Sequence, residues 1–295
     1  MQLNKVLIFG VGLIGGSLAL ALKKAGVATH IVGIGRNQDS LKTALSLGVI
    51  DEAQTDIAQA MEGADIVVIA TPVAQTPEIL AAIAPHLKAD TIITDAGSTK
   101  SDIAGYVANA AQNITPALLS QFVGGHPIAG AEKSGVSAAN ADLFFGKIVV
   151  LTPNEQTSKQ ALSKVRALWE ATGANVSEMS AEAHDQIFAA VSHLPHLLAF
   201  ALVNDLANRK NSQQLLDFAA SGFRDFTRIA GSSPEMWRDI SLANREALLS
   251  ELEAYQSELK LLQKLLENKD GAGLEAMFES ASNARNAWAK QRESK

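Results

Sequence analysis

Short apolar runs alternate with amphipathic stretches from residue 5 to about residue 179. The runs are short and rich in β-branched residues, which is typical of buried strands. We expect strands at 6–9, 30–35, 65–70, 91–95, 122–125, 147–152 and 174–179. Between them, apolar residues recur at a spacing near 3.6, which predicts helices at 16–25, 39–47, 76–88, 99–112 and 157–172. The alternation indicates an α/β fold whose first domain, residues 1–179, is a Rossmann-type, mostly parallel sheet covered on both faces.

The pattern changes after Met179, where strand-like runs stop and long helical stretches follow. Helices are expected at 181–209, 235–268 and 273–291, with Ser233 as a possible N-cap and Pro234 in the first turn. We therefore expect an all-α domain over residues 180–295. One broad apolar face of this domain predicts packing against partner helices, which could come from a second subunit, and we expect a homodimer. The face comprises Trp237, Ile240, Leu248, Leu252, Tyr255, Leu259, Leu262 and Leu266.

The turn after the first expected strand reads Gly10-Val11-Gly12-Leu13-Ile14-Gly15 and opens a helical stretch. Glycines at this spacing between a strand and a helix are typical of a dinucleotide-binding turn. Gly10 permits the tight turn, Gly12 lets the backbone approach a pyrophosphate, and Gly15 allows close packing of the helix. A tight turn without a ligand is the alternative interpretation.

The end of the second expected strand reads Gly35-Arg36-Asn37 and lacks the acid that binds the ribose hydroxyls of NAD. An arginine at this corner can pair with the 2′-phosphate of NADP, so the sequence favours NADP over NAD. Arg36 stacked on the adenine or pointing into solvent would be compatible with either cofactor.

Polar residues gather where strands of the expected sheet end, which is where open parallel sheets bind ligands. They lie at Thr71-Pro72, at 95–100 and at 124–132. A histidine directly after a strand, fixed by a following proline, is well placed to act as a general base, so we assign that role to His126. A histidine that only packs in the loop is the alternative. Ser98 could orient its imidazole, cap the helix at 99–112, or do both.

Two polar clusters stand out in the helical part. Ser192-His193-Leu194-Pro195-His196 places two histidines about one turn apart, which suits polar contacts in a cleft better than a metal site. Arg224 and Arg228, four residues apart, would point the same way on a helix and could bind a dianion. A solvated ion-pair cluster with Asp225 is the alternative for the arginines.

Composition narrows the classes of function. A net charge of −6 without a long basic run argues against nucleic-acid binding. The chain has no cysteine, which excludes disulfides, zinc–thiolate sites and a thiol nucleophile. No stretch reaches about 18 uninterrupted apolar residues and the N-terminus lacks a signal-cleavage pattern, so we expect a cytoplasmic protein without metal or membrane partners.

Together, the segments GVGLIGGSLALAL, TDAGSTKSDI, VGGHPIAGAEKSGV, SHLPH and GFRDFTRIAGSSPEMWRDI resemble the prephenate dehydrogenase family. The resemblance spans residues 5 to about 245 in the family's order. It implies oxidative decarboxylation of prephenate or arogenate to 4-hydroxyphenylpyruvate or tyrosine, with NAD or NADP as hydride acceptor. It also implies a role in tyrosine biosynthesis and a dimer formed through the helical domain. Feedback inhibition by tyrosine, if present, would have to act at the active site, because the residues beyond 245 leave no room for a regulatory domain.

The same resemblance implies roles for individual residues. His126 would bond the substrate's ring hydroxyl and Ser98 would orient His126. His196 would lie at the substrate side chain and Arg228 at a substrate carboxylate. The cleft would also be lined by Glu132, Ser192, His193 and Arg224. Relatives can carry lysine at the position of Arg224.

Two alternatives remain open beside this interpretation. A β-hydroxyacid dehydrogenase would share the glycine-rich domain but need a lysine base on the next helix, and the segment 181–205 has no lysine. A non-catalytic dinucleotide-sensing protein would leave Ser98, His126, His196 and Arg228 without a shared purpose. No residue distinguishes prephenate from arogenate as substrate.

Overall fold

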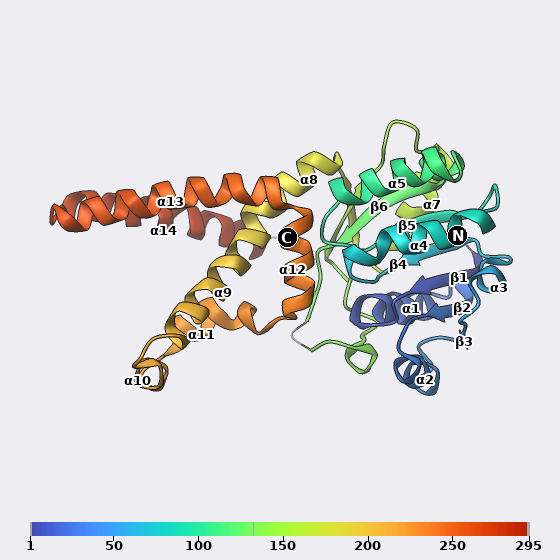
Figure 1. The fold of residues 1–295 in the computed structure, drawn as a ribbon, viewed down its shortest axis with the longest axis horizontal. Helices are drawn as coiled ribbons and strands as arrows, with labels where there is room; N and C mark the ends of the chain where they lie inside the picture. Colours follow the sequence, from blue (N-terminus) through green and yellow to red (C-terminus); the bar gives the residue numbers. More distant parts are fainter. Residues whose placement is uncertain (1, 132, 294–295) are drawn as a thin grey trace. The chain divides into compact units, whose positions relative to one another are not determined.

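The computed structural model, which describes residues 2–131 and 133–293, contains one eight-stranded sheet (Figure 1). The strand order is β3-β2-β1-β4-β5-β6-β7-β8, and all neighbours are parallel except β6 and β7. This confirms the predicted Rossmann-type, mostly parallel sheet. The strands are β1 (Leu3–Phe9), β2 (Ala28–Ile34), β3 (Glu52–Ala53), β4 (Ile66–Ile69), β5 (Ile92–Asp95), β6 (Phe122–Pro127), β7 (Ile148–Thr152) and β8 (Asn175–Glu178).

Helices cover both faces of this sheet, and the alternation of side chains along β1 shows how the two layers form. Val6 and Ile8 belong to the apolar cluster that includes Leu18 of α1, whereas Leu7 and Phe9 point into the other cluster. Because both faces are buried, the strand reads as a continuous apolar run. The helices of this part are α1 (Leu13–Ala25), α2 (Gln38–Ser46), α3 (Ile57–Met61), α4 (Thr76–Ile83), α5 (Ser101–Asn113), α6 (Ala117–Gln121) and α7 (Lys159–Glu170).

The stretch expected to be one helix at 181–209 is interrupted by a π-helical turn. Helix α8 (Ala181–Phe188) leads into the π-turn Ala189–His193, and α9 (Leu194–Ala207) follows with Pro195 in its first turn. Proline lacks a backbone N–H and cannot continue the regular ladder of hydrogen bonds, so the ladder shifts just before it. Two short helices outside the expected helical ranges come next, α10 (Ser212–Asp217) and α11 (Ser221–Thr227), the second of which holds Arg224.

The expected helix at 235–268 is broken at Asn244 into α12 (Pro234–Ala243) and α13 (Arg245–Glu267). The start of α12 is as predicted, because the Ser233 hydroxyl accepts a hydrogen bond from the Met236 amide at 3.3 Å and Pro234 follows. The last helix, α14 (Gly271–Glu293), agrees with the prediction at 273–291.

The chain divides into two compact units, Met1–Arg245 and Glu246–Lys295. The first therefore holds the sheet together with α8–α12, and the second holds α13 and α14. Several large apolar side chains of the second unit are exposed within the described chain, among them Leu249, Leu259, Leu266, Phe278 and Trp288.

One helical stretch, Ala181–Ala207, is long and apolar enough to cross a bilayer by length and composition, with a mean hydropathy of 1.6. Core helices of globular proteins satisfy the same criterion, so it carries little weight by itself. The stretch also contains the adjacent ionisable residues His184 and Asp185, which make buried hydrogen bonds within the first unit.

Candidate active site

The glycine-rich turn has the shape that a dinucleotide pyrophosphate requires. Gly10 has a φ of +87°, and a Cβ on it would lie 2.7 Å from the carbonyl oxygen of Ala70. A Cβ on Gly15 would lie 2.2 Å from the carbonyl oxygen of Gly10, so the helix can approach the turn only without a side chain there. Gly12, in contrast, faces open space. It is the N-cap residue of α1 and has no side chain that could cap the helix. The first-turn amides, including those of Leu13 and Ile14, remain available to an anion.

Thr71 and Pro72 follow β4 directly beside this turn. The methyl group of Thr71 would lie 2.9 Å from a Cβ on Gly10. The Thr71 hydroxyl is buried and has no hydrogen-bond partner among the described residues, so it can bond a ligand. Arg36 lies exposed just past the end of β2, and within the described part of the chain its guanidinium makes no hydrogen bond or ion pair. Both positions therefore fit a dinucleotide.

His126 lies near the end of β6, on the same edge of the sheet as the glycine turn, since β1, β4, β5 and β6 are parallel. Its side chain is buried, with 8% of the residue exposed. The Nδ1 atom lies 2.8 Å from Nε2 of His184 on α8. Burial, reinforced by repulsion from His184, Lys100 and His193, holds the pKa of His126 well below its usual 6.5. At neutral pH the imidazole is thus uncharged, the form that can accept a proton.

His184 in turn contacts Asp185, and this pair was not found from the sequence. The Nδ1 atom of His184 lies 2.9 Å from Oδ1 of Asp185. The Asp185 carboxylate also accepts hydrogen bonds from the backbone amides of Lys100 at 2.9 Å and Ser101 at 2.8 Å. It therefore caps helix α5 from a segment more than 80 residues away.

The predicted cap role of Ser98 is wrong. Helix α5 starts at Ser101 and its N-cap position, Lys100, makes no side-chain capping bond, because Asp185 supplies the acceptor instead. Nor does Ser98 hold the Nδ1 atom of His126, which faces His184. Ser98 still lies close to His193, because a hydrogen bond to the Ser98 backbone raises the pKa of His193, although burial outweighs it.

A second histidine pair lies on the π-turn and the start of α9. The His196 ring stacks on the Trp237 indole, with centroids 3.7 Å apart and planes inclined by 20°. Nδ1 of His196 donates to the Ser192 carbonyl at 2.9 Å, which leaves Nε2 for a ligand. Burial lowers the pKa of His196, and the nearby charge of Arg228 lowers it further. The structure thus brings His196, Trp237 and Arg228 together.

His193 is fixed by the residue that breaks the long helix. The Asn244 amide nitrogen donates to the Asp185 carbonyl at 2.8 Å and lies 3.1 Å from Nδ1 of His193. Burial lowers the pKa of His193 to about 4, so it is neutral. Asn244 thereby connects the end of α12 to Asp185 and to His193.

The two arginines differ from the expectation of one shared helical face. Arg224 lies in α11, but the helix ends at Thr227 and Arg228 starts a 3-10 turn. Arg224 is exposed and lies 3.6 Å from Asp225, which agrees with the alternative of a solvated ion pair. Glu132, expected to line the cleft, lies outside the described residues.

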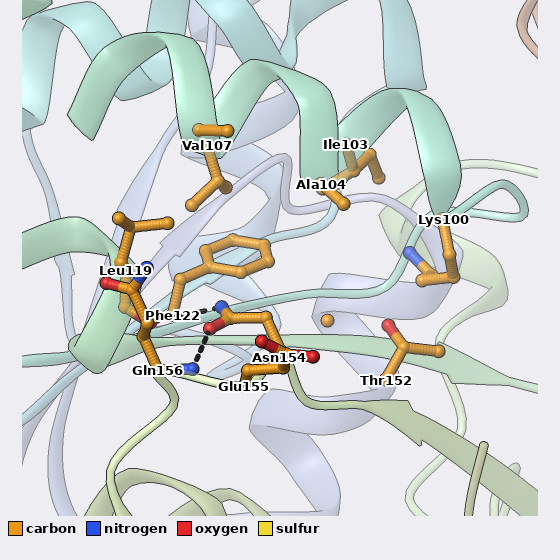
Figure 2. Close-up of a pocket in the computed structure, with 12 residues that line it drawn as sticks. Lys100, Ile103, Ala104, Val107, Leu119, Phe122, Thr152, Asn154, Glu155 and Gln156 are labelled. Atoms are coloured by element: carbon orange, nitrogen blue, oxygen red, sulfur yellow. Dashed lines mark hydrogen bonds between the residues drawn. The ribbon is translucent and has the colours of Figure 1, made fainter. Parts of the chain in front are cut away.

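A buried ion pair supports the strand that carries His126. Lys100 Nζ bonds Asp95 Oδ2, with side-chain exposures of 0% and 1%. The other oxygen of Asp95 accepts the Gly125 amide at 3.0 Å. Lys100 also lines a cavity of about 250 Å³. Figure 2 shows Lys100 at one end of this cavity, with Ile103, Val107, Phe122, Thr152 and Asn154 among the other lining residues. This cavity holds none of the predicted site residues.

The described residues include no cluster of three or more His, Asp or Glu side chains placed to hold a metal ion. The groups gathered at the edge of the sheet are instead suited to proton transfer and anion binding. They are His126, His184, Asp185, His193 and His196, with Arg228 nearby.

Comparison with known proteins assigns both parts of the chain to one family. The family model "Prephenate dehydrogenase, nucleotide-binding domain" matches residues 18–178, and "Prephenate dehydrogenase, dimerization domain" matches residues 180–280. Prephenate dehydrogenase of Bacillus subtilis is 41% identical over 284 residues, covering 96% of this chain and 75% of that protein.

Two solved structures share the fold over nearly their whole length. The crystal structure of Aquifex aeolicus prephenate dehydrogenase with hydroxyphenyl propionate and NAD+ has a TM-score of 0.89 at 39% identity, covering 97% of this chain and 98% of that one. The structure of Synechocystis arogenate dehydrogenase has a TM-score of 0.80 at 32% identity, with coverages of 96% and 99%. The chain therefore belongs to the prephenate dehydrogenase family.

Proposed function

We propose that this protein catalyses the oxidative decarboxylation of prephenate, arogenate or both, in tyrosine biosynthesis. The observation that carries the proposal is the neutral, buried imidazole of His126 at the sheet edge that also carries the glycine turn. The names of its relatives, prephenate dehydrogenase and arogenate dehydrogenase, supply the substrates. The glycine turn and the free Thr71 hydroxyl fit a nicotinamide dinucleotide, which when bound accepts a hydride.

His126 would manage the proton of the substrate hydroxyl. As the hydroxyl-bearing ring carbon loses its hydride, the oxygen becomes carbonyl-like and its proton passes to the imidazole. Loss of carbon dioxide leaves its bonding electrons in the ring, which becomes aromatic. His126 can then return the proton to the phenolic oxygen, so that it ends the cycle neutral.

The remaining polar residues would hold the two ends of the substrate. Arg228 is suited to a substrate carboxylate through charge-assisted hydrogen bonds, and the free Nε2 of His196 to the polar side chain. We assign supporting contacts in the cleft to Ser98, Ser192 and His193, and expect Arg224 and Glu132 to contribute to substrate binding as well.

We further infer that NADP is preferred over NAD. Support comes from Arg36, which is exposed just past the end of β2, where residues 34–37 include no acid. The A. aeolicus relative binds NAD+ in its crystal, so family membership alone leaves the choice open.

We also propose a cytoplasmic homodimer whose functional domains are residues 1–179 and 180–295. The dimerization-domain model begins at residue 180, which supports this boundary, although the compact units divide at residue 245. Exposed apolar side chains such as Leu259 and Leu266 on α13 are suited to a subunit interface. The buried polar side chains of His184 and Asp185 on α8 and of His193 on the π-turn argue against a membrane location.

The test is an assay of the purified protein with prephenate or arogenate, each with NAD and with NADP. We expect cofactor reduction and release of carbon dioxide in at least one mixture, with NADP giving the higher kcat/KM. Absence of reduction in all four mixtures, from protein shown to bind a dinucleotide, would refute the proposed reaction.

A further inference from the structure

We propose that His184 and Asp185 form a positioning pair that fixes which nitrogen of His126 carries the proton. The proposal rests on the proposed function, in which His126 is the base. In its resting state Nδ1 of His126 holds the hydrogen and Nε2 is the unprotonated atom that receives the substrate's proton. The hydrogen bonds among these three side chains determine this protonation state, first through the charge of Asp185 and then through the protonation of His184.

The first step is the charge of Asp185. Its oxygens accept two backbone amides, those of Lys100 and Ser101, and an amide can only donate. Burial by itself would raise the pKa of Asp185, but the hydrogen bonds from His184, Ser101 and Lys100 outweigh burial and lower that pKa. Asp185 is therefore an ionised acceptor, and the nitrogen that faces it, Nδ1 of His184, carries a hydrogen.

The second step is the state of His184. Its side chain is fully buried, and burial lowers the pKa of its imidazole despite the neighbouring carboxylate. A neutral imidazole has one hydrogen, and His184 holds it on Nδ1, so its Nε2 is an acceptor. The hydrogen in the 2.8 Å contact must therefore come from Nδ1 of His126, and the Nε2 of neutral His126 is unprotonated.

Packing keeps both rings in this arrangement. The Phe188 ring contacts His126 and His184, with centroid distances of 4.9 Å and 4.5 Å. The Asp185 backbone is held as well, because its carbonyl accepts a hydrogen bond from the side-chain Nδ2 of Asn244 at 2.8 Å. Rotation of either imidazole would therefore break a hydrogen bond and disturb a buried aromatic contact.

The consequence for catalysis is twofold. The arrangement presents the correct nitrogen, and it stabilises the imidazolium that forms when His126 takes a proton. A serine protease triad works in the same way with one imidazole, where loss of the orienting carboxylate slows turnover roughly ten-thousand-fold. Here a second imidazole, His184, lies between the carboxylate and the base.

The decisive measurement is the ring ¹⁵N spectrum of the six histidines in the full-length, histidine-labelled protein at neutral pH. Each resonance is assigned with variants in which one histidine at a time is replaced. We expect His126 and His184 both to be protonated on Nδ1 and unprotonated on Nε2. A His126 resonance protonated on Nε2 would overturn the proposal. This readout needs no substrate, so it stands even if neither cyclohexadienyl acid is turned over.

Variants of His184 give a second, independent readout. In His184→Leu, Nδ1 of His126 has no acceptor, and we expect kcat to fall roughly a hundred-fold or more with the dinucleotide Kd unchanged. In His184→Gln, the amide can accept from His126 and donate to Asp185, so kcat should recover to within about ten-fold of wild type. If His184→Leu retains kcat within about three-fold, the pair does not position the base.

A matched control is His30→Leu. His30 also pairs with a carboxylate, Glu52 at 3.0 Å, but it lies on β2 away from His126. We expect its kcat to be unchanged. If His184→Leu fails to fold, the His184→Gln kinetics and the spectrum decide, and a hundred-fold loss in His184→Gln with the Nδ1-protonated state of His126 retained would refute the positioning role.

Discussion

Lys100 and Asp95 form an ion pair, and both side chains are almost completely buried. Asp95 also accepts a hydrogen bond from Gly125, the residue before His126 on β6. Removing one partner of such a pair leaves an uncompensated buried charge. The pair also has an electrostatic effect, because the Lys100 ammonium lowers the pKa of His126 and that of His184.

Replacing Lys100 with Met should therefore lower the free energy of unfolding by about 3 to 5 kcal/mol. Denaturant unfolding would measure it. Lys24→Met is the control, because Lys24 pairs with Asp142 at the surface, where an ion pair contributes only about 0 to 1 kcal/mol. Equal effects of the two substitutions would contradict the importance of burial.

The pH dependence of kcat/KM should reflect the lowered pKa of His126. Since the base must be unprotonated, activity should persist below pH 6.5 and be lost only as the pH falls through the lowered pKa. In Lys100→Met, loss of the nearby cation should move this acid limb to higher pH. An unchanged limb in a folded variant would show that another group controls the profile.

The substitution His126→Asn should reduce kcat roughly a hundred-fold or more, because Asn cannot accept the substrate proton. The Kd for the dinucleotide, measured by fluorescence titration, should stay near the wild-type value. Retained turnover would mean that another group accepts the proton.

Two glycines of the turn should respond differently to alanine. Gly10→Ala places a side chain at a φ of +87° and 2.7 Å from the Ala70 carbonyl, so it should lower Tm by several degrees. Gly12→Ala adds a methyl group in open space, so Tm should be unchanged while the Kd for the dinucleotide rises. Gly105→Ala also adds a methyl group in open space, on helix α5. Because alanine favours a helix over glycine, this control should raise Tm slightly and leave the Kd for the dinucleotide unchanged.

Protein stability should fall between pH 6.5 and pH 4 through His193. The folded state keeps this imidazole neutral down to its pKa of about 4, whereas the unfolded chain takes up a proton near 6.5. Acid therefore favours unfolding over this window, by about 3 kcal/mol in total from this group. The loss should be smaller in His193→Gln, and an equal loss in both proteins would assign it to other groups.

Local sequence patterns correctly predicted the elements whose structure depends on residues close together in the chain. The apolar run of β1 and the glycines after it were sufficient to locate the first strand, turn and helix. Strand β3 was missed because it pairs only Glu52 and Ala53, and neither residue type marks a strand. The break at Asn244 was missed because the apolar spacing continues across it, while the contacts that fix Asn244 come from Asp185 and His193.

The active site shows the same division. His126 was recognisable because a strand, glycines and a proline surround it in the chain. His184 and Asp185 gave no comparable signal, since their partners lie 58 and 84 to 85 residues away. An ionisable pair at the start of an apolar helix was the one available hint.

The capping of α5 by Asp185 has a consequence for engineering and for evolution. The first turn of a helix in the nucleotide-binding part is completed by a carboxylate from the part that follows it. The two parts are therefore not interchangeable modules. Because the donors are backbone amides, a chimera that takes its helical half from a distant relative must keep a carboxylate at the position of Asp185, or the first turn of α5 will lose its cap.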